Sequence, residues 1–403
     1  MSVTLEEVRE ARERCRDQLV KTPCAPSAPF GEMFGGKAWF KFENLQITGS
    51  FKERGALNRM SLLAAEERER GVVTASAGNH AQAVAFHARR MGVPATVVMP
   101  ERTPLVKTSN TERFGAKVIL HGAGYDQAME EALRLRDETG AALVHPFDDP
   151  GVIAGQGTAG LEILHQTPEP DVVVVPVGGG GLISGLAVAV KETLPSVRVV
   201  GVEAAVIPAA LRSRQAGARV TVPPAETIAE GISVRKLGEH TFPLIEKYVD
   251  DLVTVDEEEI ASAVLMLLER EKTVAEGAGA AGVAAVVHGK VRDLEGKDVV
   301  IILSGGNIDV NLLSRIIERG LAKDGRLARL EVRISDRPGA LASLTARLAE
   351  CGANILRLDH QRGREGIWLT ETVISLTMET RGQEHVREIR RALEEHGYTV
   401  SQR

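Results

Sequence analysis

Short apolar runs that alternate with helix-like segments limit the fold of this chain more than any other feature. Four such runs follow Gly71, at residues 72–75, 95–99, 117–120 and 141–144, and a second block from Gly151 contains runs at 172–177, 197–202 and 299–303. Strands that alternate with helices are typical of a parallel sheet with helices on its faces. The sequence therefore predicts an α/β protein whose ligands lie at the carboxyl ends of the strands.

Four consecutive glycines separate the run at 172–177 from a helix expected from Leu182 to about residue 190; they are Gly178, Gly179, Gly180 and Gly181, here called the glycine run. Backbone amides without side chains can wrap a phosphate at a helix start. Glu203 ends the next strand, as a ribose-binding acid would in a dinucleotide fold. No reading frame gives G-x-G-x-x-G, because its last position falls on Ile183 or Ser184. We therefore expect a phosphate of another kind.

Lys52 stands where a strand-like segment at 39–43 gives way to a helix marked by Ala56, Met60 and Leu63. A lysine beside an aromatic ring and small residues can be partly desolvated, which lowers its pKa and leaves a nucleophilic amine. Such an amine can form a Schiff base with an aldehyde.

Two further turns follow apolar runs. The first consists of Ser76, Ala77, Gly78, Asn79 and His80 and leads into a helix, and the second begins at Ser304. The amides at a helix start favour an anion such as a carboxylate. Because carboxyl ends of parallel strands meet at one edge, we expect Ser304, the glycine run and the first turn to converge on one crevice.

Composition bounds the class of protein. The chain has 403 residues, of which 43% are hydrophobic, and a net charge of −6 with acidic and basic residues interspersed. This favours a small-molecule substrate over nucleic acid. The three cysteines form no CxxC pair, no zinc site is expected, and no run approaches a membrane span. We expect a cytoplasmic protein.

The C-terminal part reads as a separate small domain. A polar segment at 318–326, bounded by glycines, has the composition of a linker. The following residues predict the order β-α-β-β-α-β of a ferredoxin-like domain. Gly339 again precedes a helix and permits close approach of a ligand to the backbone, so an effector site is expected there.

Four segments together resemble those of the fold-type II pyridoxal-phosphate enzymes, specifically threonine dehydratases. They are Ser50–Ala56, Ser76–His80, Gly178–Leu182 and Ser304–Asn307. The resemblance implies a tryptophan synthase β-like core with two lobes over residues 1–320, the smaller lobe being about 50–147. Residues 321–327 would be a linker, and 328–403 resemble an ACT domain, an amino-acid-sensing module.

The resemblance also implies roles for individual residues. Pyridoxal 5'-phosphate would be bound by Phe51, Lys52, Asn79, Ser304, Gly178, Gly179, Gly180, Gly181 and Leu182. Lys52 would be the Schiff-base lysine and catalytic base, Asn79 would contact the phenolic oxygen and Ser304 the ring nitrogen. The substrate carboxylate would lie on the turn of Ser76, Ala77, Gly78, Asn79 and His80. An effector such as a branched-chain amino acid would bind near Gly339 and Asn354.

The implied reaction is dehydration and deamination of L-threonine, and of L-serine, to 2-oxobutanoate or pyruvate and ammonia. Serine racemases of the family carry a second serine where this chain has Ala77, so dehydration should dominate; a racemase or a dehydratase of another hydroxy amino acid is the alternative, and a non-catalytic sensor a remote one. Glu203 matches a metal-ligating acid of some relatives, but its companion carboxylate is missing, and no metal is expected. An open four-stranded sheet leaves edges that a copy can extend, so we expect a homodimer or homotetramer.

Overall fold

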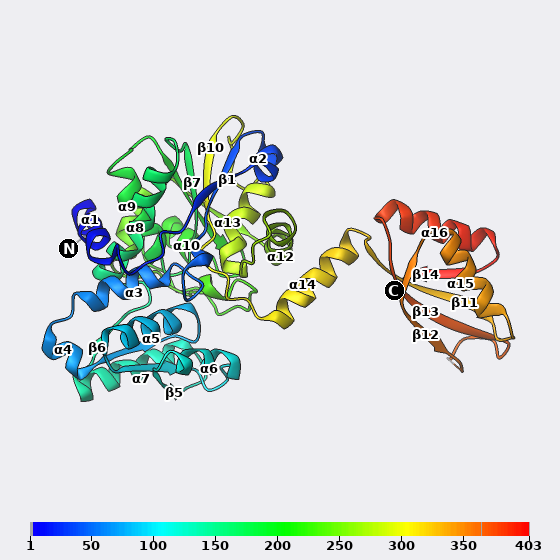
Figure 1. Ribbon diagram of the computed structural model, residues 1–403, viewed down its shortest axis with the longest axis horizontal. Helices are drawn as coiled ribbons and strands as arrows, with labels where there is room; N and C mark the ends of the chain where they lie inside the picture. Colours follow the sequence, from blue (N-terminus) through cyan, green and yellow to red (C-terminus); the bar gives the residue numbers. More distant parts are fainter. Residues whose placement is uncertain (1–2, 364, 403) are drawn as a thin grey trace. The chain divides into compact units, whose positions relative to one another are not determined.

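The computed structural model describes residues 3–363 and 365–402, which form two compact units, Met1–Ile308 and Asp309–Arg403 (Figure 1). The division falls before the expected boundary at 320 because helix α14 (Val310–Lys323) belongs to the second unit. The segment expected as a linker therefore consists largely of the end of α14 and the start of β11. Apolar residues at helical spacing continue through Leu321, and Glu318 on the helix pairs with Arg329, which explains why a glycine-bounded polar segment is helical here.

The larger lobe of the first unit contains a six-stranded sheet in the order β1-β2-β10-β7-β8-β9. The strands are β1 (Cys24–Ser27), β2 (Lys37–Lys41), β7 (Val172–Pro176), β8 (Arg198–Ala204), β9 (Asp251–Val255) and β10 (Asp298–Ile302), and only β1 is antiparallel to its neighbour. Val173 and Val175 pack with Leu182 of α9 (Gly181–Lys191). Val174 faces α13 (Gly277–Val287) on the other side. Both faces are covered, as expected for near-continuous apolar strands.

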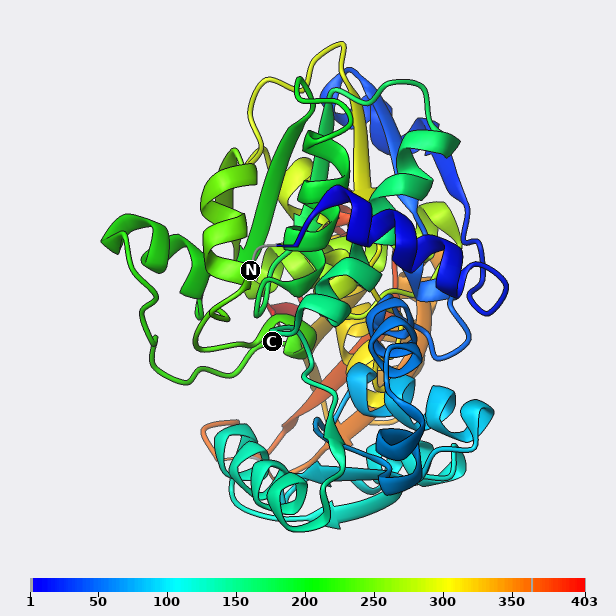
Figure 2. The same ribbon diagram turned by 90° about the vertical axis from the view of Figure 1, so that its left-hand side faces the viewer.

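The smaller lobe contains a parallel sheet in the order β5-β4-β3-β6, with β3 (Val72–Ala75), β4 (Ala95–Met99), β5 (Lys117–Leu120) and β6 (Ala142–Leu143). These strands lie on the four predicted runs. Helix α5 (Asn79–Met91) packs on one face, and α7 (Tyr125–Thr139) covers the other through Ala128 and Ala132. Helix α6 (Leu105–Arg113) connects β4 to β5. The predicted α/β fold is confirmed, and Figure 2 shows the two lobes one above the other.

Helix α3 (Lys52–Ser61) lies between the lobes and packs on α5 and on α8 (Pro150–Gln166). A buried ion cluster anchors its first turn: Arg54 binds the Glu43 carboxylate at 2.7 Å and that of Glu162 at 2.8 Å, and Lys41 also binds Glu162. Removing one partner of such a buried cluster leaves an uncompensated charge, which costs about 3–5 kcal/mol. The cluster therefore fixes the helix start that carries Lys52.

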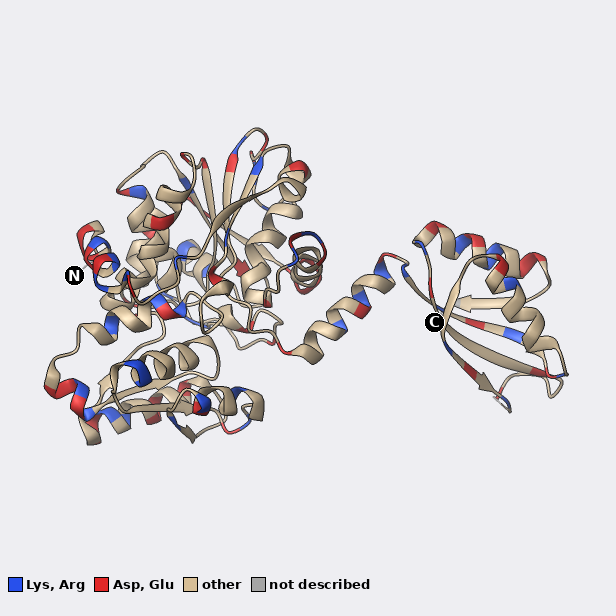
Figure 3. Ribbon diagram, viewed as in Figure 1, with Lys and Arg blue, Asp and Glu red and all other residues tan. Residues whose placement is uncertain are grey.

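The other helices of the first unit surround this framework. They are α1 (Leu5–Cys15), α2 (Ala28–Phe34), α4 (Ala65–Arg70), α10 (Ala209–Ala216), α11 (Thr241–Tyr248), α12 (Glu257–Met266) and the short turns η1 (Glu43–Leu45), η2 (Glu230–Ile232) and η3 (Leu267–Glu271). Acidic and basic residues are mixed along the exposed faces of each unit (Figure 3). Over the described residues, no helix has the length and apolar character needed to cross a bilayer.

The second unit has the predicted order β-α-β-β-α-β after α14. Its elements are β11 (Leu327–Ser335), α15 (Ala340–Glu350), β12 (Asn354–Gln361), β13 (Glu371–Glu379), α16 (Gln383–Glu395) and β14 (Thr399–Gln402), and the sheet order is β12-β13-β11-β14. Leu330, Ile374 and Leu376 pack on the two helices with Leu344 and Ile389. The ferredoxin-like prediction is confirmed.

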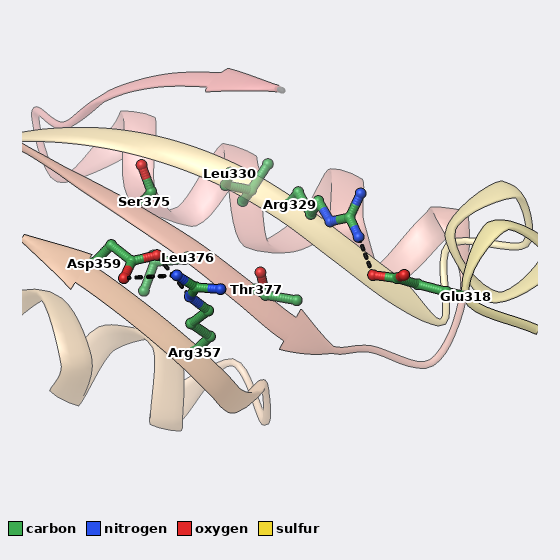
Figure 4. Close-up of a pocket in the computed structure, with 8 residues that line it drawn as sticks. All are labelled: Glu318, Arg329, Leu330, Arg357, Asp359, Ser375, Leu376 and Thr377. Carbon is green, nitrogen blue, oxygen red and sulfur yellow. Dashed lines mark hydrogen bonds and ion pairs between the residues drawn. The ribbon is translucent and has the colours of Figure 1, made fainter. Parts of the chain in front are cut away.

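The face of this sheet that the two helices leave open is polar. Arg329 and Arg357 lie opposite Thr377 in one cross-strand row, and they line a hollow of about 440 Å³ with Glu318 and Asp359 (Figure 4). Each arginine is already ion-paired there, Arg357 with Asp359 at 2.8 Å and Arg329 with Glu318. The charges of these two arginines are thus compensated within the unit.

Candidate active site

Lys52 lies at a corner held to the end of strand β10. The amide of Phe51 donates to the Ser304 carbonyl at 3.0 Å, and Ser50 and Gly305 form an isolated antiparallel bridge. The Lys52 ammonium donates to the Pro146 carbonyl at 2.7 Å and lies 5.2 Å from the centroid of the Phe51 ring. The side chain is half-buried and points into the protein instead of bulk solvent.

Burial lowers the pKa of the Lys52 amine to about 8, while the negative charge of Glu276 partly opposes this shift. A lysine with such a pKa is neutral in about one molecule in ten at pH 7, far more often than a solvated lysine. It can therefore act both as a nucleophile and as a proton acceptor.

The glycine run lies at the end of β7, next to the end of β10 in the sheet. A Cβ atom on Gly179 would lie 2.3 Å from the Phe147 ring, and Gly180 has φ +93. Helix α9 starts directly after Gly180 and has no side-chain cap, so its first amides keep their donors for another acceptor. A phosphate is the group that such a bare, buried helix start suits best.

The turn before α5 has a similar form in the smaller lobe. Its cap residue Gly78 has no side-chain bond, and a Cβ atom there would meet nothing within 4 Å, so the turn faces open space. The hydroxyl of Ser76 accepts from the Gly78 amide at 3.2 Å. His80 is tied to the Val144 carbonyl at 2.9 Å, and burial, with the nearby Lys52 charge, lowers its pKa to about 3, so its ring is neutral. The Ala77 side chain adds no donor or acceptor to this turn.

Asn79 is the centre of a hydrogen-bond chain that joins both lobes. Its amide nitrogen donates to the Glu276 carboxylate at 2.6 Å, and its oxygen accepts from Asn307 at 2.8 Å; Asn307 also donates to the Thr48 carbonyl at 2.7 Å. A Cβ atom on Gly305 would lie 2.4 Å from Glu276 Oε1 and 3.1 Å from the Asn79 amide nitrogen, so a larger residue there would displace the Glu276 carboxylate. The orientation of the Asn79 amide is thus fixed from both sides.

Glu276 is half-buried at the start of α13, and burial raises the pKa of its carboxyl to about 7. The hydrogen bond from Asn79 and the charges of Lys107 and Lys52 lower it, and that of Glu230 raises it further. Sequence reasoning missed this residue, because an acid just before a Gly/Ala-rich segment reads as an ordinary helix cap. It missed Pro146 and Phe147 as well, since nothing local indicates that their loop folds back onto Lys52.

The structure brings most of the predicted site residues together. Ser304, 2% exposed, follows β10 beside the corner of Phe51 and Lys52, while Leu182 is buried in the first turn of α9. Gly339 and Asn354 belong to the second unit.

The Glu203 carboxylate accepts from the amides of Ala210 and Leu211 at 2.6 and 2.8 Å and so caps α10. No group of three or more candidate metal ligands occurs among the described residues.

Comparison with protein families adds the observation that decides the class. Residues 16–305 match the family model described as pyridoxal-phosphate dependent enzyme, and residues 328–396 match that of the ACT domain. The chain belongs to the pyridoxal-phosphate dependent enzymes. The fold-type II core and the ACT domain expected from the sequence are confirmed.

Individual members of this enzyme family are similar over most of the chain. L-threonine ammonia-lyase of Thermotoga maritima is 51% identical over 398 residues, which cover 99% of each chain. A crystal structure of threonine deaminase from T.th. is 42% identical with a TM-score of 0.72 and covers 76% of this chain and 99% of that one. Maize serine racemase is 37% identical with a TM-score of 0.75, covering 80% of this chain and 99% of that one.

The cofactor of this family, pyridoxal 5'-phosphate, fits the residues present. Its phosphate needs several donors without side chains in the way, and the glycine run offers an uncapped helix start. Its aldehyde needs an amine with a lowered pKa, which Lys52 supplies close to the glycine run, because Lys52 bonds Pro146 and the adjacent Phe147 ring packs against Gly179. We therefore take this crevice as the candidate active site.

Proposed function

We propose that the protein is a threonine ammonia-lyase that converts L-threonine, and L-serine, to the 2-oxo acid and ammonia. Three sets of contacts support the proposal in a chain that is 51% identical over 398 residues to an L-threonine ammonia-lyase: the corner of Lys52 bonds Ser304, Asn79 bonds Glu276 beside Gly305, and Phe147 next to Pro146 packs on the glycine run. The bound cofactor supplies an electron sink for the bond at the substrate Cα.

The residues of this chain then have separable tasks. The uncapped amides of α9 would hold the cofactor phosphate, and the turn from Ser76 to His80 would hold the substrate carboxylate. Lys52 would take the substrate Cα proton at Nζ, and the Pro146 carbonyl, which accepts a hydrogen bond from that nitrogen, would keep it in place. Asn79 would hold the phenolic oxygen of the cofactor, and the orientation of its own amide depends on Glu276 and Asn307.

Two residues favour elimination over racemisation. Ser304 is a neutral partner for the ring nitrogen and cannot hold it protonated as an aspartate would, so a carbanion is stabilised less strongly. Ala77 leaves the turn without the hydroxyl that would return a proton from the second face. Loss of the β-hydroxyl is therefore expected to be faster than inversion of the configuration at Cα.

A substrate panel tests this proposal. Purified holoenzyme is incubated with L-threonine, L-serine and 3-hydroxyaspartate; 2-oxo acids are quantified, and residual serine is resolved on a chiral column. We expect 2-oxobutanoate from threonine as the fastest product and less than about one D-serine per ten pyruvates. Racemisation faster than elimination would favour the racemase alternative, and turnover of 3-hydroxyaspartate alone would favour the other dehydratase.

The ACT domain supports a proposal of amino-acid control. Gly339 precedes α15 and Asn354 follows it, so the two expected effector residues lie at opposite ends of a helix of 11 residues, about 16 Å long. One small amino acid cannot touch both within one chain. Strand β12 is an edge strand, and antiparallel pairing of two copies along it would place Gly339 of each near Asn354 of the other. We propose this pairing as the effector-binding arrangement of a homodimer or homotetramer.

A further inference from the structure

We propose that the ion pair between Lys107 and Glu230 holds the smaller lobe over the crevice during turnover, which makes both positioning residues. Lys107 lies on α6 of the smaller lobe and Glu230 begins η2 of the larger lobe. The inference rests on the proposed function, because it concerns the substrate of the same crevice.

The turn that carries Glu230 forms part of the wall of the site. A Cβ atom on Gly231 would lie 3.3 Å from Glu276 Oε1, and one on Gly178 would lie 3.0 Å from the Cα atom of Ile232. Turn η2 therefore packs both on Glu276, the partner of Asn79, and on Gly178, the first glycine of the glycine run. The charges of Lys107 and Glu230 also act on the Glu276 carboxyl, whose pKa the first lowers and the second raises.

The substrate and the cofactor are held by different lobes. The turn from Ser76 to His80, expected to bind the substrate carboxylate, belongs to the smaller lobe, and the glycine run, expected to bind the cofactor phosphate, belongs to the larger one. Substrate can be positioned only when the lobes are held together, yet it must enter and product must leave. A second inter-lobe pair, Arg235 with Asp126 at 3.0 Å, joins the next part of the same loop to α7.

The strength of an exposed ion pair suits a contact that forms and breaks in every cycle. The side chains of Lys107 and Glu230 are 30% and 67% exposed. Pairs of this kind stabilise an arrangement by about 0–1 kcal/mol, which corresponds to a shift of up to about five-fold in a two-state equilibrium. A buried, stronger pair would trap the product.

Three variants of the full-length holoenzyme test the inference: Lys107→Met, Glu230→Gln, and the charge reversal Lys107→Glu with Glu230→Lys. We expect the KM for L-threonine to rise about two- to five-fold in each single variant, with kcat within about two-fold, and to return toward the wild-type value in the charge reversal. The KM of the wild type should rise with salt, and this dependence should weaken in Lys107→Met.

Lys191→Met is the matched control, because it removes an ion pair of 2.8 Å with Asp250 within the larger lobe alone. Its KM should not change. Amide hydrogen exchange at residues 228–234 should be faster in Lys107→Met, but not in the control, at equal urea stability. Unchanged KM and exchange in the single variants, equal changes in the control, or no recovery in the charge reversal would each overturn the inference. If wild-type enzyme does not act on threonine, the proposed function fails, and the exchange measurement still decides whether the pair holds the lobes.

Discussion

The helix starts at Gly180 and Gly339 have nearly the same local form and very different surroundings. Both glycines precede a helix without a side-chain cap, with φ +93 and +89. A Cβ atom on Gly180 would lie 2.8 Å from Ile245 and 2.9 Å from Thr241, whereas one on Gly339 would meet nothing within 4 Å. The first start is enclosed by its own chain, and the second is open. A completed site needs such an enclosure, which the described residues of the second unit do not supply around Gly339.

The largest effect is expected in the enclosed region, from Lys52→Ala. Removing the amine should abolish both the absorbance band of the lysine-linked cofactor and 2-oxobutanoate formation, a loss of at least about 10³-fold in kcat/KM. Absorption spectra and product assays on the same preparation check this. Retained turnover would mean that the crevice is not the active site.

A comparison of Gly180→Ala with Gly339→Ala separates the effect of an enclosed site on stability from the effect of backbone strain. Both changes force an alanine into a left-handed conformation at about 1–2 kcal/mol, but only the first adds overpacking of about 1–3 kcal/mol. We expect Gly180→Ala to lose cofactor affinity and stability, and Gly339→Ala to keep full cofactor binding. Urea unfolding and cofactor titration measure the two effects, and equal losses would show that enclosure does not distinguish the sites.

The substitution Glu276→Gln, in the enclosed region, should change how the free energy of unfolding of the protein depends on pH. Burial raises the pKa of this carboxyl from 4.5 to about 7, so the folded state binds more protons than the unfolded chain between these values. The contribution of Glu276 to the free energy of unfolding therefore falls by on the order of 1–3 kcal/mol as the pH rises from 4.5 to about 7. Above pH 7 it stays at the lower value. Urea unfolding of both proteins at pH 5 and pH 8 checks the prediction. A difference between them that does not vary with pH would contradict it.

The smallest effect on catalysis is expected from deleting the second unit, which contains the open helix start at Gly339. A chain that ends at Ile308 retains the compact first unit and should keep threonine turnover within about two-fold. Any response to isoleucine or valine should disappear with the ACT domain. Assays with and without these amino acids, on full-length and truncated protein, decide the matter; a truncated enzyme that still responds would move the effector site into the first unit.

The sequence predicted the regular parts of the molecule well, because local patterns control them. Strands β3, β4 and β5 have the predicted bounds, and the ferredoxin-like order of the second unit follows from apolar residues at strand and helix spacing. The pyridoxal-phosphate family and its ACT domain followed from short motifs whose residue types are each tied to one chemical role.

The boundary between the units and the function of Glu276 could not be predicted in the same way. Helix α14 contains Gly320 and ends in charged residues, which resemble a linker until the contact of Glu318 with Arg329 is known. Glu276 lies 197 residues from Asn79 in sequence, and no local pattern joins them.

The amino-acid sequence by itself determined the elements, the glycines at their ends and the lysine on which the chemistry depends, because propensity and periodicity act over a few residues. Tertiary structure alone decided which polar groups share one crevice and how strongly each is desolvated. Those properties depend on neighbours distant along the chain, as with the pKa of Lys52, the fixed amide of Asn79 and the pair of Lys107 with Glu230.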